Sequence, residues 1–186
     1  PLDARVRRVV EQAIIEQRPP FSLGRAIADA GIPHAGTDIS DGLPGAIHAI
    51  CGASDCGAFV DELSIPMHPH LNDLVTASGL SPLQLSIAGG DWQFLYAVPP
   101  DHLPMMHQLA SSLDAKVTVI GGITTNQEIV IRHSDGAWHL LERREHESFT
   151  DDGNGAGHFA RTEAATARRG ASLEGRNFET LWRNLA

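Results

Sequence analysis

The sequence predicts a single α+β domain, built on a mixed β-sheet with helices packed on one face. Its length of 186 residues suits one domain with a short appendage. A content of 42% hydrophobic and 20% charged residues is ordinary for a globular chain. Helical and strand patterns are interleaved, but they lack the regular strand–helix–strand alternation of a parallel sheet, which favours α+β.

The first part of the chain predicts helices before and after a short extended segment. Apolar residues recur at helical spacing over residues 3–17, and a short helix follows over about 22–30. Residues 34–39 read as extended, and Ser40 or Asp41 can cap the helix that comes next. The buried face of that helix is expected to consist of Leu43, Ile47, Ile50 and Cys51.

The middle of the chain predicts the sheet. Residues 57–61 look like a strand, and 81–87 fit either helix or strand. Residues 92–98 give the strongest strand signal and are apolar on both faces, which predicts a central strand. Short helices are expected near Leu71 to Gly79 and over 103–113.

The last strands are followed by a change in composition. Residues 117–120 predict a strand ended by two glycines, and 128–132 and 137–141 predict a hairpin around Ser134-Asp135-Gly136. We therefore place the domain at 1–149 and a flexible linker at 150–158. An arginine-rich tail over 159–186, interrupted by Gly170 and Gly175, is expected to be a docking helix.

Charge is distributed unevenly along the chain. The net charge is −9, and residues 26–131 hold eleven Asp or Glu but a single cation, Lys116. A nucleic-acid partner or a basic membrane-binding face is therefore disfavoured. Cys51 and Cys56 have no second pair to complete a zinc site, so we expect buried small hydrophobes in a reducing, cytoplasmic setting. No apolar run approaches the ~20 residues of a membrane span.

The segment Gly36-Thr37-Asp38-Ile39-Ser40-Asp41-Gly42-Leu43 is the first candidate site. It compresses carboxylates, hydroxyls and glycines into one strand-to-helix junction. A helix N-terminus suits phosphate, and Asp38 and Asp41 are hard oxygen ligands suited to Mg²⁺. The alternative is plain helix capping. The candidate phosphate contacts are Thr37, Ser40 and Gly42.

A second candidate precedes the predicted central strand. Gly89, Gly90, Asp91 and Trp92 form a glycine turn that would place one carboxylate at a strand edge, although a bulge alone would also explain it. His68-Pro69-His70 lacks a third ligand nearby and reads as an exposed loop.

These segments together resemble the C-terminal domain of the aminoimidazole-ribonucleotide (AIR) synthetase-related superfamily, over about residues 20–149. The nearest branch is that of the thiamine-monophosphate kinases. Thr37-Asp38-Ile39-Ser40-Asp41-Gly42-Leu43 is similar to the signature of that branch, and the strand over 57–61 follows at a similar place. The run from Gly89 to Pro100 resembles the family's Gly-Glu-Asp-Tyr-Glu segment and the strand after it, and Ile120-Gly121 resembles a strand end.

The resemblance implies an ATP- and Mg²⁺-dependent phosphotransferase with a small phosphorylated metabolite as acceptor. It implies that Asp38 and Asp41 hold metal and act in catalysis, that Ser40 contacts nucleotide phosphates, and that Asp91 lines the acceptor pocket. It also implies a homodimer. The family's N-terminal half has no counterpart in these residues, so the module is expected to be inactive alone.

Departures from the family's pattern keep other functions open. Gly90, Trp92 and Gln93 replace the family's Glu, Tyr and Glu, and Gly122 stands where the kinases often have Arg. The acceptor can therefore differ from thiamine phosphate. A selenophosphate-synthetase-like or hydrogenase-maturation-like enzyme, or a non-catalytic ligand-binding domain, remains an alternative.

Overall fold

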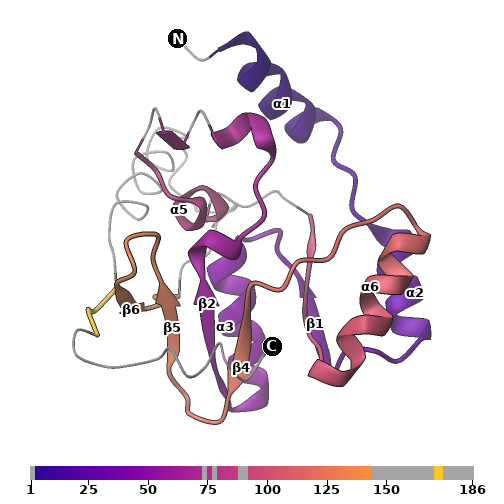
Figure 1. Cartoon of the computed structure of the whole chain (residues 1–186), viewed down its shortest axis with the longest axis vertical. Coiled ribbons are helices and arrows are strands. Elements are labelled where there is room, and N and C mark those ends of the chain that lie inside the picture. The colour runs from indigo at the N-terminus through magenta and orange to yellow at the C-terminus, as the bar shows by residue number, and fades with distance from the viewer. Residues whose placement is uncertain (1–2, 73–74, 77–78, 88–91, 144–169, 174–186) are drawn as a thin grey trace, which may run out of the picture.

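The computed structural model describes residues 3–72, 75–76, 79–87, 92–143 and 170–173 (Figure 1). Its helices are α1 (Ala4–Ile15), α2 (Phe21–Asp29), α3 (Leu43–Ser54), α5 (Pro82–Ser86) and α6 (Leu103–Ser112). Its 3-10 turns are η1 (Glu62–Ser64), η2 (Pro69–Leu71) and η3 (Pro100–His102). Its strands are β1 (Ala35–Asp38), β2 (Gly57–Asp61), β3 (Phe94–Ala97), β4 (Gly121–Thr124), β5 (Ile129–Arg132) and β6 (Trp138–Leu140).

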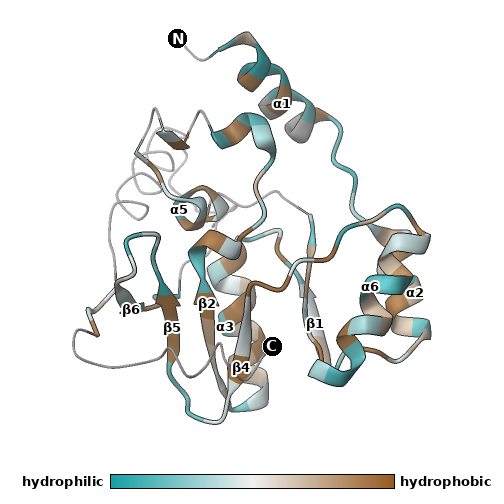
Figure 2. Cartoon of the chain, in the orientation of Figure 1, coloured by the Kyte–Doolittle hydropathy of each residue, from teal (hydrophilic) through white to brown (hydrophobic). Residues whose placement is uncertain are grey.

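The main sheet has four strands in the order β4-β2-β5-β6. β2 pairs antiparallel with β4 and parallel with β5, and β5 pairs antiparallel with β6, so the predicted mixed sheet is confirmed. Figure 2 shows β2 and β5, the two inner strands, as largely hydrophobic. This is expected because inner strands are covered on both faces.

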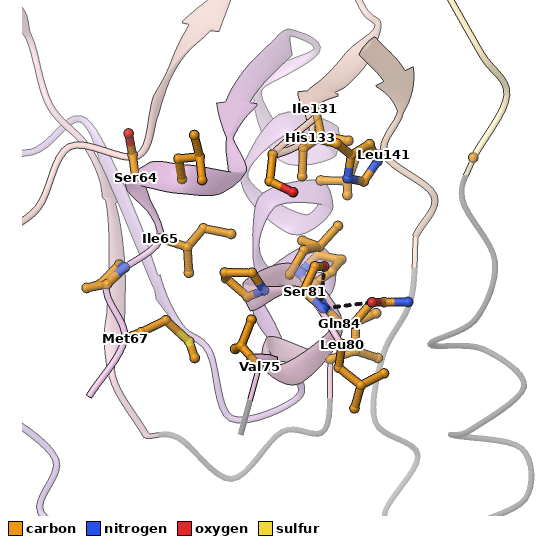
Figure 3. A pocket seen from close by; sticks show the side chains of 18 of the residues that line it. Ser64, Ile65, Met67, Val75, Leu80, Ser81, Gln84, Ile131, His133 and Leu141 are labelled. Carbon is orange, nitrogen blue, oxygen red and sulfur yellow. Dashed lines mark hydrogen bonds between the residues drawn. The ribbon is translucent and has the colours of Figure 1, made fainter. Parts of the chain in front are cut away.

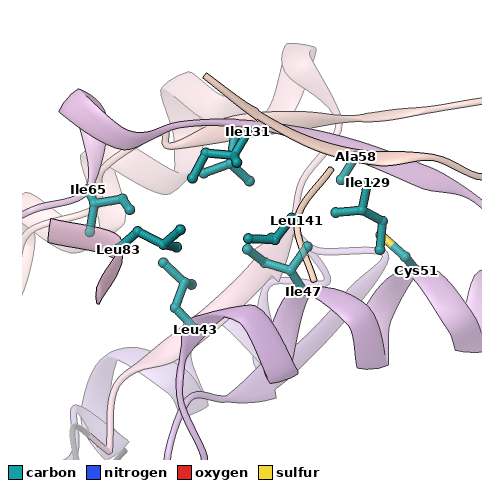
Figure 4. Packing of buried hydrophobic residues seen from close by; sticks show 10 residues of the cluster. Leu43, Ile47, Cys51, Ala58, Ile65, Leu83, Ile129, Ile131 and Leu141 are labelled. Carbon is teal, nitrogen blue, oxygen red and sulfur yellow. The ribbon is translucent and has the colours of Figure 1, made fainter. Parts of the chain in front are cut away.

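Helix α3 covers one face of this sheet. Side chains of β2 and β5 pack against its apolar face, as predicted for that helix (Figure 4). The cluster comprises Leu43, Ile47, Cys51, Ala58, Val60, Ile65, Leu83, Ile129, Ile131 and Leu141. On the other face, Phe59, Val130 and Trp138 form a smaller cluster that Leu140 and Leu173 join.

A separate two-stranded ribbon of β1 and β3 lies beside the main sheet (Figure 1). The prediction that β3 is a central strand of the sheet was wrong, since β3 pairs with β1 and its residues are half-buried. A different reason explains why both faces of β3 are apolar. Leu95 packs on the α3 cluster, whereas Tyr96 packs on a second core that α2 and α6 build. That core comprises Leu23, Ile27, Ile32, Met106 and Ala110.

The predicted strand over 117–120 was wrong by about four residues, because β4 begins at Gly121. A Cβ at Gly121 would lie 1.9 Å from the carbonyl oxygen of Phe59, so a glycine is required where β4 approaches β2.

The hairpin was predicted correctly, and Gly136 in its turn has φ of +85°. A capping box of Ser81 and Gln84 begins α5, which settles the ambiguous segment as a helix.

Residues 170–173 lie beside β6, where Ser172 forms an isolated antiparallel bridge with His139. The N–H of Leu140 donates to the carbonyl of Ala171 at 2.9 Å, and that of Leu173 donates to the carbonyl of Trp138 at the same distance. This segment therefore lies along β6, and a helix does not run through it. The remainder of the expected tail and the linker over 150–158 lie outside the described residues. Among the described helices, none has the length and hydropathy to cross a membrane.

Candidate functional site

The first candidate segment forms the turn between β1 and α3. β1 ends at Asp38, and the N–H of Ile39 donates to the carbonyl of Gln93 at 3.0 Å. The N–H of Gly42 then donates back to the carbonyl of Ile39 at 2.9 Å, which closes a tight turn before α3 begins. Thr37, Asp38, Ser40 and Asp41 are therefore gathered at one end of the ribbon, opposite the start of β3.

Asp38 and Ser40 interact directly within this turn. The Ser40 hydroxyl donates a hydrogen bond to the Asp38 carboxylate, and the Thr37 hydroxyl lies 3.5 Å from its other oxygen. The bond from Ser40 is the main reason that the pKa of Asp38 lies below its usual value, against a smaller opposing effect of burial. An exposed, ionised carboxylate with a hydroxyl beside it is suited to a divalent cation or a phosphate-bound metal.

Gly42 has a structural role at the start of α3. It is the N-cap residue, with φ of +98°, so the prediction that Ser40 or Asp41 caps this helix was wrong. A Cβ at Gly42 would lie 2.9 Å from the carbonyl oxygen of Ile87. The first turn of α3 is thus buried against the end of α5. The exposed groups of the site are those of the preceding turn, and phosphate binding by Gly42 stays a prediction.

The donor set of this turn fits a metal that is shared with a ligand. Asp38 and Asp41 are both exposed, and within the described ranges no group of three or more His, Cys, Asp or Glu side chains could hold a metal ion. Mg²⁺ commonly uses one or two carboxylates together with substrate phosphates and water. Two carboxylates in one turn match that mode and do not match an all-protein cage.

The second candidate segment lies mostly outside the described residues. This applies to Gly89, Gly90 and Asp91, whose roles remain predictions. Trp92 is described, with φ of +39° and 41% of its surface exposed. It precedes Gln93, whose carbonyl binds the Ile39 N–H, so the segment leads directly to the Asp38 turn. His68 and His70 lie exposed at η2, as predicted.

Next to α5 the structure contains a cavity of about 760 Å³, which the sequence did not reveal (Figure 3). Pro44 and Ile87 line it on the side of the α3 N-terminus, and Ile131 and Leu141 line it from the region of the main sheet. His133 also lines it and adds a polar group. These residues come from widely separated parts of the chain, so no local motif could indicate the cavity.

A buried acid holds His133 in place. Oε2 of Glu62 lies 3.2 Å from Nδ1 of His133 and accepts the N–H of Ser134 at 3.0 Å. Burial alone would raise the pKa of Glu62, but hydrogen bonds from His133, Ser81 and Ser134 outweigh it and lower the pKa. Two consecutive acids at the end of a buried strand, Asp61 as its last residue and Glu62 directly after it, were the available sequence signal.

Asp61, the neighbour of Glu62, connects the ends of β2 and β5 through its side chain. Its Oδ1 lies 3.0 Å from Nε of Arg132, and its Oδ2 accepts the Ser64 hydroxyl at 2.8 Å. Asp61 is 5% exposed, so its carboxylate is largely shielded from water, whereas the Arg132 side chain is 30% exposed. Both acids therefore serve the packing of β2 against β5, and the exposed acids Asp38 and Asp41 remain the candidates for metal binding.

Comparison with curated proteins finds thiamine-monophosphate kinases. The kinase of Halobacterium salinarum is 33% identical over 88 residues, which are 47% of this chain and 28% of that protein. The Escherichia coli K12 kinase is 29% identical over 143 residues, 76% of this chain and 40% of that protein. The chain thus spans between about a quarter and two fifths of the length of these relatives.

Comparison with solved structures gives the same fold. The thiamine-monophosphate kinase of Stenotrophomonas maltophilia matches with a TM-score of 0.63 and 26% identity, over 73% of this chain and 41% of that one. HypE of E. coli, a hydrogenase maturation protein, matches with a TM-score of 0.56 and 19% identity, over 66% and 39%. AaThiL complexed with AMPPCP and TMP matches with a TM-score of 0.62 and 18% identity, over 80% and 43%.

A family model agrees with these matches. The model of the AIR synthase related protein, C-terminal domain, matches residues 16–134, which include the Asp38 turn, α3 and the strands through β5. The resemblance inferred from the sequence is thereby confirmed: the chain belongs to the family of AIR synthase related proteins, as a form of their C-terminal domain.

Proposed function

We propose that the chain is the C-terminal module of an ATP- and Mg²⁺-dependent phosphotransferase that acts on a small phosphorylated acceptor, as thiamine-monophosphate kinases do. The observation that supports this most directly is the Asp38 carboxylate, which is exposed at the end of β1 and accepts the Ser40 hydroxyl, so that its pKa lies below its usual value. Kinship with thiamine-monophosphate kinases adds support.

Each residue of the turn has a proposed role. Asp38 and Asp41 bind the cation, and Gly42 lets α3 start close to α5. The hydroxyls of Ser40 and Thr37 point to Asp38 in this structure and would turn from it to donate to phosphate oxygens when nucleotide binds. The bound Mg²⁺ would neutralise phosphate charge, which is the main electrostatic requirement of phosphoryl transfer. The acceptor would lie near Trp92 and the preceding Gly89-Gly90-Asp91.

The proposed site needs more positive charge than residues 26–131 supply. Residues 26–131 contain a single cation, Lys116, whereas transferred phosphates require several compensating positive charges. We infer that an N-terminal half or a partner chain completes the site, and that the functional unit is a homodimer. The 186-residue chain should therefore bind Mg·ATP weakly and should not turn it over.

Calorimetric titration of the chain with Mg·ATP tests the metal role. Asp38→Asn should weaken binding by ~10-fold, which corresponds to about 1.4 kcal/mol. Asp101→Asn, an exposed acid in η3, is the matched control and should leave the affinity unchanged. Equal affinity of wild type and Asp38→Asn would refute the metal role. Robust phosphorylation of thiamine monophosphate by the chain alone would refute the need for further residues.

Two other functions have specific support. The match to HypE favours an ATP-using enzyme of hydrogenase maturation or a related activity, and a screen of phosphorylated products would separate it from the kinase. The cavity of about 760 Å³ favours a non-catalytic ligand-binding domain. Tight binding of a metabolite with no ATP consumption would support that second alternative.

A further inference from the structure

The C-terminus of α3 brings two thiols together. Asp55 follows the helix in the left-handed conformation, with φ of 50° and ψ of 47°. The N–H groups of Asp55 and Cys56 both donate to the carbonyl of Cys51, the latter at 3.1 Å. The bond from the Cys56 N–H to the Cys51 carbonyl is that of a Schellman motif, in which the side chains at these two positions are frequently in contact. Here the two side chains are Cys51 and Cys56.

The two cysteines differ in access to solvent. Cys51 is 2% exposed and packs with Ile47, Ala58 and Ile129 in the core between α3 and the sheet (Figure 4). Cys56 is half-buried at the edge of that cluster. Burial, reinforced by the charge of Cys56 and a hydrogen bond with its side chain, raises the pKa of the Cys51 thiol to about 12. A reagent in solution therefore reaches Cys56 first.

The backbone hydrogen bond keeps the two cysteines close to the separation of a disulfide. Standard bond lengths and the 3.1 Å hydrogen bond limit the separation of the two Cα atoms to at most about 7 Å. Disulfides span about 4.4–6.8 Å between Cα atoms. Both residues belong to one turn, so a bond between them closes within that turn.

We propose that Cys51 and Cys56 form an oxidisable dithiol that closes to a disulfide when a low-molecular-weight disulfide reaches Cys56. The Cys56 thiolate attacks one sulfur of the oxidant, forms a mixed disulfide and releases the first thiol. Cys51 then attacks the Cys56 sulfur and releases the second thiol. The two protons of the cysteines end on the two released thiols, so the protein loses two electrons and the oxidant gains them. This inference is independent of the proposed function.

The second step should depend strongly on pH. Only the thiolate of Cys51 attacks, and because burial raises the pKa of this thiol, the thiolate fraction rises about tenfold per pH unit while the pH stays below that pKa. Closure from the isolated mixed disulfide should therefore accelerate about tenfold per unit between pH 7 and pH 9. A closure rate that does not change with pH would exclude Cys51 as the attacking group.

The test uses the full chain and oxidised glutathione. After oxidation, alkylation of free thiols and denaturation, a protease that cleaves before Asp cuts between Ser54 and Asp55 and so separates the two cysteines. We expect mass spectrometry to find these peptides still linked, and dithiothreitol to release them. Peptides that are never linked, or a link only between two chains, would overturn the proposal.

Single-cysteine variants separate the role of Cys51 from that of Cys56. Cys51→Ala should stop at the glutathione adduct on Cys56, because no second thiol is available to close the ring. Cys56→Ser should react slowly or not at all, because Cys51 is buried. Thermal unfolding checks that each variant is folded, and the pH dependence of closure in the wild-type chain tests the mechanism even if Cys51→Ala does not fold. Equal reaction of Cys56→Ser and wild type would overturn the proposed order of attack.

Discussion

Nδ1 of His133 lies 3.2 Å from Oε2 of Glu62, and both side chains are buried where β2 and β5 end. A buried carboxylate normally costs free energy, and here the imidazole and the N–H of Ser134 offset that cost. The pair therefore joins the two inner strands of the sheet at one edge of the cavity, since His133 lines that cavity.

Replacing Glu62 should destabilise the fold. Glu62→Gln removes the charge that holds His133 and leaves a buried imidazole with a poorer partner, at a cost of about 2 kcal/mol in the free energy of unfolding. Chemical denaturation at neutral pH measures this. Glu11→Gln on the exposed side of α1 is the matched control, expected to change stability by less than about 0.5 kcal/mol.

The same pair gives the stability a defined dependence on pH. Because the pKa of Glu62 is lowered on folding, its contribution is fully present above the ordinary value of 4.5 and is lost as the pH falls through the folded-state pKa. The stability difference between wild type and Glu62→Gln should therefore shrink in acid, below pH 4.5. A difference that grows as the pH falls would contradict this account.

Removing the Ser40 hydroxyl should raise the pKa of Asp38 toward 3.8, its ordinary value, because the bond from Ser40 is the largest cause of the lowering. Carboxyl NMR titration of Ser40→Ala measures the shift. Thr37→Val also removes one hydroxyl, but that hydroxyl lies 3.5 Å away and contributes least. An equal shift in the two variants would show that Ser40 has no special role.

Alanine substitutions at two glycines of α3 and its N-cap should change the free energy of unfolding in opposite directions. At Gly42, φ is +98° and a Cβ would lie 2.9 Å from a backbone oxygen, so Gly42→Ala should cost about 1–3 kcal/mol. At Gly52, inside α3, a Cβ meets nothing within 4 Å, so Gly52→Ala should stabilise by about 0.5–1 kcal/mol. Thermal unfolding of both variants checks the pair, and effects of the same sign would contradict the structure.

The contact of residues 170–173 with β6 can be tested by hydrogen exchange. A Cβ at Gly170 would lie 1.9 Å from the carbonyl oxygen of Leu140, so Gly170→Ala should displace the segment. The amides of Leu140 and Leu173 should then exchange faster, since their acceptors lie across this contact. The exposed Ser172→Ala is the control and should leave both amides protected. Unchanged exchange in Gly170→Ala would show that the segment is not held there.

Local signals predicted much of this fold. The β5–β6 hairpin followed from its turn residues, because a glycine with positive φ is a property of the turn itself. The Asp38 turn was also located from the sequence, because its candidate residues lie within one short segment, Thr37 to Gly42. Long-range features were not predictable in this way. Glu62 and His133 are 71 residues apart, and neither residue type alone indicates the other.

The errors have physical reasons too. The prediction for β4 treated Gly121 as the end of a strand, whereas Gly121 is its first residue, and glycine is needed there because a Cβ would lie 1.9 Å from the carbonyl oxygen of Phe59. The prediction for β3 attributed two apolar faces to a central position in one sheet. The structure instead places Leu95 and Tyr96 against two different cores.

That placement fixes the alignment of the ribbon. Adjacent residues of a strand point to opposite faces, so a slip of β3 by one residue would turn Leu95 toward the core of Tyr96 and Tyr96 toward that of Leu95. The two different cores thus fix the strand register in which Asp38 pairs with Phe94. Hydrophobic packing on both faces of β3 therefore fixes its register against β1. This register sets the position of the Asp38 carboxylate relative to Trp92.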